Sequence, residues 1–451
     1  MPEPSAAPDL AELTAAALAA AGGDESVEAF AEESRRTEVE ARLGEVEGLT
    51  SAQSRGLGVR VIVGGRLGFA YVADPSVEEA RRAVEHAREN ASLASEDGHN
   101  TLPEARPYQP IDGLYFAEQV AMSPADKVAL ALELERTAIT AEPEVTKVER
   151  CSFGDAVGRV RIESTTGVQA EFERTSCWVV AVTLAERDGD TQTGYSFQVG
   201  HRVSELDPDG VAREAAVRAA RMLGATKPAT QRVPVVLDPF AASAFLGVLA
   251  GALSAESVQK RRSLFANLLG ERVGAEVFTL VDDGRLVAGP SACPFDDEGV
   301  PSGRTELITA GALNGFLHNT YTAGRGGTSS TGNASRAGYR STPGVGTSNF
   351  YVEPGASSFE DLLDAAGDGV LIQEVSGVHS GANPVSGEFS VGATGLRIAG
   401  GAIAEPVREM TIASTVPEML RAIAAVGSDL RFFSSVGTPS ILVGEMTVAG
   451  L

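Results

Sequence analysis

Histidine side chains are the first candidates for a reactive site, because an imidazole can bind zinc or transfer a proton near neutral pH. The chain has five, at His86, His99, His201, His318 and His379. None has another histidine within five residues, whereas zinc sites favour ligands that one helix turn or tight loop holds together. The spacing therefore predicts no local zinc site. A metal site assembled from distant residues, such as His318, His379 and the acids of 296–298, stays open as an alternative.

Three consecutive acids stand in FDDEGVP, residues 295–301. Such oxygen ligands suit a hard cation, but the ligand spacing of an EF-hand loop is absent. Gly and Pro follow the acids, so we expect a turn with a solvated acidic face. Cys293 lies just upstream in SACPF, without a neighbouring base that could activate its thiol. No G-x-S-x-G motif is present either, so these residues predict no nucleophile.

The segment GRGGTSSTGNAS, residues 324–335, resembles a phosphate-binding loop in its glycine spacing. Gly327 and Gly332 match that spacing, but Asn333 and Ala334 stand where Lys and Ser or Thr are required. Without the lysine no cation faces the phosphates, so a nucleotide site is disfavoured. Two interpretations stay open: a flexible Gly/Ser surface loop, or a loop that contacts a peptide or another ligand.

The stretch FLGVLAGALSAESVQKRRSLF, residues 245–265, predicts a helix whose first half carries no chemistry. It is made of Ala, Gly, Leu, Val and Phe around one Ser, and no residue before Glu256 could bind a metal or move a proton. No histidine lies anywhere in 230–317. We expect this helix to pack in the core, where its small residues permit close approach of neighbouring elements.

The composition indicates a globular protein with a strongly acidic surface. The 451 residues are 43% hydrophobic and carry a formal net charge of -24. Such a surface repels phosphate backbones and anionic membranes, which disfavours both as partners. The N-terminal Ala/Leu run has acidic flanks where a secretory signal needs basic ones, and the three cysteines form no CxxC. We therefore expect a cytoplasmic protein without disulfides.

The elements that must position any site indicate an α+β fold, because helices and strands do not alternate strictly. We expect an N-terminal α+β unit over 1–95, a linker over 96–122 and a central unit over 123–225. Strands of the central unit over 145–204 read as an antiparallel meander between two helices. A β-rich C-terminal domain over 230–451 follows, with many short strands amid Gly and Ser.

The C-terminal domain is also where a family resemblance becomes visible. Six segments follow one another in order, among them FTLVDDGRL, CPFDDEGVPSGRTELITAGALNGFLHNTYTA, TGNASRAGY, TSNFYVEPG and GVLIQEVSGVHSGANPVSGEFSVGATGLRIAGGAIAEPV. Together they resemble the TldD/TldE (PmbA) family of zinc metallopeptidases, best over about 230–450. The two N-terminal units resemble the first and middle domains of that family more weakly.

The resemblance implies a two-chain assembly. TldD subunits hold zinc with an HExxxH helix and a downstream cysteine, and TldE subunits resemble them but lack that motif. Aligned on the downstream QKRRS, the motif window falls on Val248, Leu249 and Leu253, in place of the two His ligands and the Glu. The cysteine is missing as well, since VGSDLRFFSSVGTPS, residues 426–440, contains none. This pattern resembles the TldE-type subunit.

The resemblance therefore predicts a non-catalytic partner subunit that binds no metal, with zinc in a TldD-like HExxxH chain. The pair would enclose a cavity in which peptides or unfolded segments are cut. We expect the Gly-rich loops at 324–335 and 376–395 to line it, with Arg325, Asn333, Arg336 and His379 as substrate-binding residues. Two alternatives remain: a metallopeptidase with a non-standard metal site, and a self-associating peptide-binding scaffold.

Overall fold

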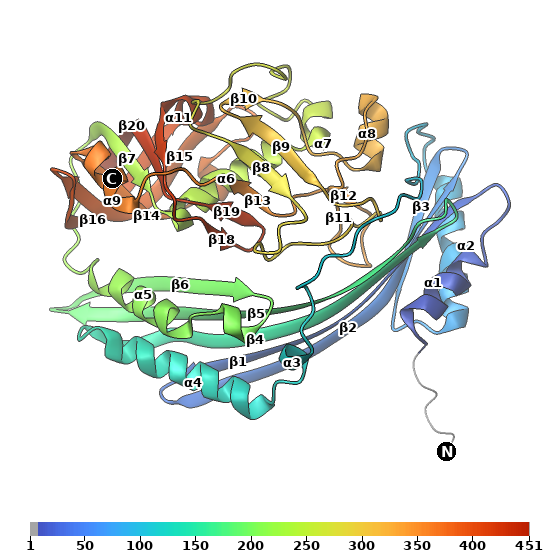
Figure 1. Cartoon of the computed structure of the whole chain (residues 1–451), viewed down its shortest axis with the longest axis horizontal. Coiled ribbons are helices and arrows are strands. Elements are labelled where there is room, and N and C mark those ends of the chain that lie inside the picture. Colours follow the sequence, from blue (N-terminus) through green and yellow to red (C-terminus); the bar gives the residue numbers. More distant parts are fainter. Residues whose placement is uncertain (1–7, 451) are drawn as a thin grey trace.

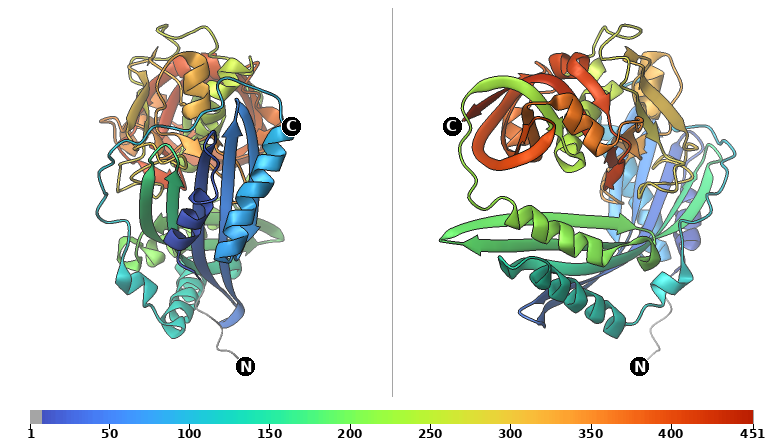
Figure 2. Two further views of the ribbon diagram at one scale, coloured as in Figure 1. Left: turned by 90° about the vertical axis from the view of Figure 1, so that its right-hand side faces the viewer. Right: turned by 60° about the vertical axis from the view of Figure 1, so that its left-hand side comes forward.

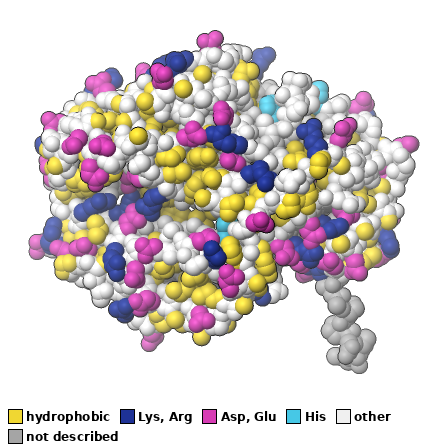
Figure 3. Space-filling view, viewed as in Figure 1, with side chains coloured by type: hydrophobic (Ala, Val, Ile, Leu, Met, Phe, Trp, Pro, Cys, Tyr) yellow, Lys and Arg dark blue, Asp and Glu magenta, His cyan; other side chains and the backbone are white. Residues whose placement is uncertain are grey.

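One long, curved antiparallel sheet forms the base of the molecule (Figure 1). The structure is a computed structural model, and it describes residues 8–450. Helices cover the convex side of the sheet and the C-terminal domain lies over its concave side, an arrangement that the turned views repeat (Figures 1 and 2). Charged side chains of both signs are interspersed on the face shown in Figure 3.

The long sheet has six strands in the order β3-β2-β1-β4-β5-β6. They span β1 Ser26–Arg42, β2 Glu45–Val63, β3 Arg66–Ala73, β4 Val145–Ser164, β5 Gln169–Arg187 and β6 Asp190–Gly200. The antiparallel meander expected over 145–204 is confirmed as β4, β5 and β6. Strand β1 pairs with β4 as well as β2, with Phe30 opposite both Gly58 and Ile162. The N-terminal and central units thus share one sheet.

Alternation along the strands decides what covers each side of this sheet. On β1, Val27, Ala29 and Ala31 face the helices, and Glu28 and Phe30 face the C-terminal domain. The helices are α1 Leu10–Leu18, α2 Val77–Leu93, α3 Ala117–Val120, α4 Pro124–Ala141 and α5 Pro208–Ala220, with the short 3-10 turn η1 Val203–Glu205. Ser123 caps α4 directly before a proline, as the sequence predicts.

The C-terminal domain holds two six-stranded sheets and one two-stranded ribbon. The sheet orders are β10-β9-β8-β13-β19-β18 and β16-β15-β14-β7-β20-β17, and the ribbon is β11-β12. The strands are β7 Gln231–Leu237, β8 Leu280–Asp283, β9 Arg304–Thr309, β10 Ala312–Leu313, β11 Ala334–Ser335, β12 Gly344–Val345, β13 Phe350–Val352, β14 Gly369–Ser376, β15 Glu388–Ala399, β16 Ala402–Thr415, β17 Ile423–Val426, β18 Arg431–Phe433, β19 Val436–Thr438 and β20 Ile441–Gly450.

Six helices complete this domain. They are α6 Pro239–Ala252, α7 Ala255–Gln259, α8 Thr320–Gly326, α9 Phe359–Ala366, α10 Val378–Gly381 and α11 Val416–Ala422. One large hydrophobic cluster joins α6 to strands of both sheets. The α+β fold expected from the sequence is confirmed. No helix within residues 8–450 has the length and apolar character that a membrane crossing requires.

Candidate functional site

Helix α6 lies in the middle of the C-terminal domain. Asp238 caps its start, since one carboxylate oxygen accepts a hydrogen bond from the backbone N–H of Ala241 at 2.9 Å. Val248, Leu249 and Leu253 are 8%, 0% and 0% exposed and belong to the main hydrophobic cluster. The side chains at the motif window are therefore core side chains, and Leu253 already stands at the end of the helix.

Residues 426–440 lie beside the same helix. Strands β18 and β19 both contact α6, and the ring centroids of Phe240 and Phe433 are 5.6 Å apart. Thr438 is fully buried, and its hydroxyl donates to the backbone oxygen of Pro439 at 2.8 Å. The two segments on which the resemblance places zinc ligands are thus neighbours in space, although here they meet mainly through apolar groups.

The residues at this place do not fit a zinc ion. Zinc is bound by imidazole nitrogen, thiolate sulfur or carboxylate oxygen, and Val248, Leu249 and Leu253 offer none of these. Across residues 8–450, no three His, Cys, Asp or Glu side chains converge so that they could hold a metal. The alternative site of His318, His379 and the acids of 296–298 is therefore not assembled in this structure.

The two histidines of that alternative lie in different surroundings. His379 is exposed on the short helix α10. His318 is half-buried before α8, and its backbone N–H donates to the hydroxyl of Thr331 at 2.8 Å. Burial lowers the pKa of His318, so its imidazole is neutral at neutral pH. Within residues 8–450, neither ring belongs to a group of three or more potential metal ligands.

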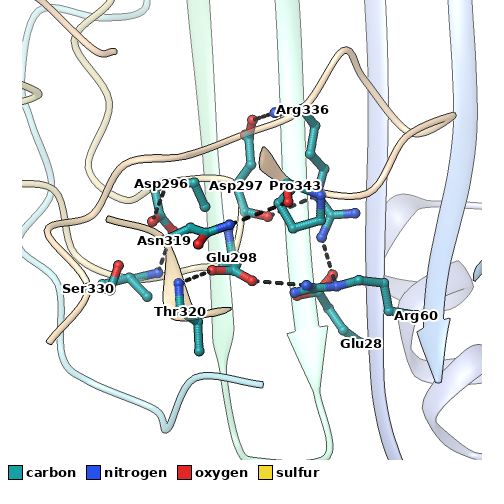
Figure 4. A network of polar contacts seen from close by, with 12 residues as sticks. Glu28, Arg60, Asp296, Asp297, Glu298, Asn319, Thr320, Ser330, Arg336 and Pro343 are labelled. Carbon is teal, nitrogen blue, oxygen red and sulfur yellow. Dashed lines mark hydrogen bonds and ion pairs between the residues drawn. The ribbon is translucent and has the colours of Figure 1, made fainter. Parts of the chain in front are cut away.

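The acidic turn 295–301 is buried, so the expected solvated acidic face is wrong. Asp296 and Glu298 are 4% and 1% exposed. The turn lies where loops of the C-terminal domain meet the concave side of the long sheet (Figure 4). Asp296 accepts hydrogen bonds at 2.9 Å from the backbone N–H groups of Glu298, Val300 and Ala334. The carboxylate thus replaces lost water with backbone donors.

Two arginines hold this turn to the sheet. Arg60 on β2 donates to Glu28 on β1 and to Glu298 of the turn, each at 2.9 Å. Arg336 pairs with the same Glu28, and its Nε donates to the backbone oxygen of Asp297 at 3.0 Å. We call these groups the polar seam, and its members are Glu28, Arg60, Asp296, Asp297, Glu298 and Arg336. It joins residues far apart in the sequence into one buried network (Figure 4).

The polar seam contains four carboxyl groups but two guanidinium groups. Burial by itself would raise the pKa of Glu28, but Arg336 and Arg60 outweigh burial and lower it. Burial raises the pKa of Asp297 to about 6. Burial, together with the nearby Glu298, raises the pKa of Asp296 well above its ordinary value. The seam therefore favours protons on the two carboxyls that no arginine side chain pairs with directly.

A polar pocket of about 300 Å³ adjoins the seam. The long sheet contributes Phe30 and Arg174, and the C-terminal domain contributes Cys293, Asp297 and Arg336. Arg174 forms no ion pair with any carboxylate among residues 8–450, so it is the cation of this pocket that a ligand could engage. Burial raises the pKa of the Cys293 thiol to about 11, which leaves the thiol protonated and a poor nucleophile.

Comparison with known proteins assigns the chain to a family. Three family sequence models match: PmbA/TldA metallopeptidase domain 1 over residues 27–91, the central domain over 118–223 and the C-terminal domain over 230–450. The chain belongs to the PmbA/TldD family of metallopeptidases. The family resemblance noted in the sequence is therefore confirmed, and it extends to both N-terminal units.

Individual relatives cover nearly the whole chain. Metalloprotease PmbA of Escherichia coli O157:H7 is 29% identical over 98% of this chain and 96% of its own length. A TldD homolog of Haemophilus influenzae is 27% identical over 88% and 87%. A Thermotoga maritima crystal structure described as a modulator of a DNA gyrase aligns with TM-score 0.90 and 28% identity, over 98% and 100%. TldE from Thermococcus kodakarensis aligns with TM-score 0.87 and 25% identity, over 94% and 97%.

Two of the four residues expected to bind substrate already have hydrogen-bond or ion-pair partners within the chain. The amide of Asn333 donates to Asp282 at 2.6 Å and accepts from the hydroxyl of Thr331 at 2.7 Å. The side chain of Arg336 is 0% exposed because it is held in the polar seam. Both residues line the polar pocket, but their polar groups point to partners within the chain.

The other two residues are exposed but lie on helices. Arg325 belongs to the last turn of α8, so the segment 324–335 begins as helix, whereas His379 belongs to α10. Gly332 and Asn333, at the other end of that segment, are buried. A flexible Gly/Ser surface loop therefore describes only the middle of the segment.

Sequence reasoning missed the residues that build the seam on the sheet side. Arg60 lies between Val59 and Val61 and is the single charge of the apolar stretch 56–63. A lone arginine in such a strand is a signal for a buried ion pair, because a buried charge needs a partner. Arg174 carries no comparable signal, since charged residues surround it in β5.

Proposed function

We propose that this chain is the zinc-free, TldE-type subunit of a two-chain peptidase, and that its partner is a TldD-type chain with an HExxxH zinc site. The observation that carries the proposal is the motif window on α6. Val248, Leu249 and Leu253 are apolar and buried there, beside a segment 426–440 that contains no cysteine. Both halves of the zinc site are replaced together, as expected for a chain that has another role.

The role we propose is to complete the substrate cavity and to hold a peptide or an unfolded segment in it. The polar pocket supports this role, because Arg174 offers a cation for peptide carbonyls or a carboxylate. The exposed Arg325 and His379, both in the C-terminal domain, are further proposed contacts with the peptide. Direct contact with DNA is disfavoured, since the net charge of -24 repels a phosphate backbone.

Zinc content tests the first half of the proposal. The purified chain should contain far less than one zinc per chain after mild dialysis, because no set of ligands is present on α6 or beside it. Elemental analysis that finds close to one zinc per chain would overturn the proposal. A TldD-type chain treated in the same way provides the positive control.

Pairing tests the second half. Co-expression with a TldD-type chain, followed by native mass measurement, should give a one-to-one complex, and an obligate interface typically buries more than about 2,000 Å². Peptide cleavage should require both chains. If this chain forms no complex with its TldD-type homologue, and the homologue cleaves peptides without this chain, the partner-subunit function is wrong.

A further inference from the structure

The outer edge of strand β2 is open over more than half of its length. β2 pairs with β1 throughout, but β3 covers its other side only from Gly56 to Val63. The last contact is the hydrogen bond from the backbone N–H of Asp74 to the backbone oxygen of Arg55, at 3.0 Å. Among residues 8–450, no other strand and no backbone hydrogen bond reaches the outer side of residues 45–54.

Alternation along an antiparallel strand determines which backbone groups face this open side. Because the oxygen of Arg55 points toward β3, the backbone groups of Gln53, Ser51 and Leu49 point the same way. A bulge near Glu47 then ends the regular run. Three alternate residues thus each present an unpaired N–H and an unpaired C=O at the edge of the sheet.

The opposite edge of the same sheet is protected, whereas this edge is not. Strand β5 extends beyond β6 over Gln169–Ser176, and the chain segment 103–116 runs along that part. There the backbone N–H of Thr175 donates to the oxygen of Leu114 at 2.9 Å, and Tyr108 bonds the backbone of Glu171 at 3.3 Å. The fold therefore covers one unpaired strand end with its own chain and leaves the other uncovered.

Over residues 48–54 the sequence of the open edge also lacks the usual protection against strand pairing, whereas Glu45, Glu47 and the bulge lie at its turn end. Exposed edges commonly carry lysine, proline or inward-pointing charges. Residues 48–54, Gly-Leu-Thr-Ser-Ala-Gln-Ser, contain neither a charge nor a proline. Apolar side chains are exposed nearby, with Leu49 at 53% and Leu43, in the hairpin turn, at 81%. This edge has the properties of an interface.

We propose that two copies of this chain associate through this edge, with their β2 strands antiparallel about a two-fold axis near Thr50. The open stretch 45–54 is centred close to that residue, so the axis overlaps both open stretches along nearly their whole length. In this arrangement the hairpin turn between β1 and β2 of one copy lies next to the end of β3 of the other copy. The two six-stranded sheets become one continuous sheet.

The side chains in this register are complementary. Leu49 of each copy lies beside Ser51 of the other, and the two Leu49 side chains become diagonal neighbours on one face of the sheet. Glu47 of one copy lies beside Gln53 of the other, whereas Glu47 and Arg55 keep their partners within the chain, Arg42 at 3.2 Å and Glu33 at 3.6 Å. The uncharged residues thus meet in the middle of the paired stretch. The proposal concerns the isolated chain and does not depend on the pairing with a TldD-type chain.

A proline tests the backbone pairing. Ser51→Pro removes an outward N–H that no group among residues 8–450 uses, whereas Ser51→Ala keeps it and serves as the matched control. Sedimentation of the full chain, without a TldD-type chain, should show wild type and Ser51→Ala as dimers at micromolar concentration. Ser51→Pro should dimerise at least about tenfold more weakly, with an unchanged circular dichroism spectrum.

Charges introduced at Leu49 provide a second test that does not depend on proline. Leu49→Glu and Leu49→Lys should each weaken the dimer, because each places like charges at diagonal positions, and an equimolar mixture of the two variants should restore it. A wild-type chain that stays monomeric up to about 100 µM overturns the proposal. So does a dimer that neither Ser51→Pro nor the single charged variants at Leu49 weaken. Both results leave the proposed zinc-free subunit role untouched, because that role is read from zinc content and from pairing with a TldD-type chain.

Discussion

The motif window on α6 and the polar seam are both buried, yet the window contains only apolar side chains and the seam contains charged ones. The window is filled by Val248, Leu249 and Leu253 and contains no group that could pair with a charge. The seam buries Glu28 and Glu298 to 1% exposure beside Arg60. Burial alone therefore does not decide which side chains a site tolerates. Donors within hydrogen-bond distance decide it: guanidinium groups for Glu28 and Glu298, and backbone N–H groups for Asp296.

Removing that guanidinium should have the largest effect. Arg60→Met removes two buried ion pairs, with Glu28 and with Glu298, and leaves Glu298 without a cation, so we expect a loss of about 3–5 kcal/mol in the free energy of unfolding. Urea unfolding of the isolated chain measures the loss. Arg232→Ala is the control, because its pair with Glu445 lies at the surface, with side chains 66% and 58% exposed, and should cost less than about 0.5 kcal/mol. Equal losses for the two variants would remove the contrast between seam and surface.

Adding a charge to the window should have the next largest effect. Leu249→Glu buries an unpaired carboxylate in the apolar cluster, and we expect a loss of about 3 kcal/mol. Gly251→Glu, on an exposed position of the same helix with no atom close to an added Cβ, should cost much less. Thermal melts compare the two variants. In the reconstituted complex, peptidase activity per folded complex should stay near wild type, whereas a specific rise in zinc content would contradict the packing role of α6.

The seam should also make stability depend on pH. The pKa of Asp297 is raised to about 6 in the folded chain, above the unfolded value of about 3.9. Protonation therefore favours the folded state, so the contribution of this group is unfavourable at pH 7.5 and is relieved as the pH falls through about 6. Stability measured by urea at pH 7.5 and 5.5 should rise at the lower pH. Asp297→Asn should flatten this rise, and the exposed control Asp188→Asn should not.

The smallest effect on stability should come from an exposed cation. Arg325→Ala in the reconstituted complex should change stability by less than about 0.5 kcal/mol. If the side chain contacts the peptide, the catalytic efficiency should fall through a weaker apparent affinity, with kcat preserved. Steady-state cleavage of an unfolded peptide measures both constants. Unchanged constants for Arg325→Ala and for Arg174→Ala would place the substrate away from both cations.

Local patterns in the sequence were enough for much of the fold. Sequence patterns predict the helices α4 and α5 that flank the meander, and the three strands of the meander itself. The apolar window on α6 is likewise readable, because absent ligand types are visible in the sequence itself. These features depend on neighbours within a few turns or strands, which a linear pattern records.

The burial of the acidic turn was decided only by the tertiary structure. Glu298 meets Arg60 across 238 residues of sequence, and Arg336 meets Glu28 across 308. No local pattern records such distances, so three consecutive acids were expected in solvent. The same long-range pairing holds Arg336 in a buried ion pair with Glu28. The pairing of β1 with β4 likewise joins the N-terminal and central units into one sheet. The sequence determined which elements and side chains are present, and the packing of distant strands decided which charges are paired and buried.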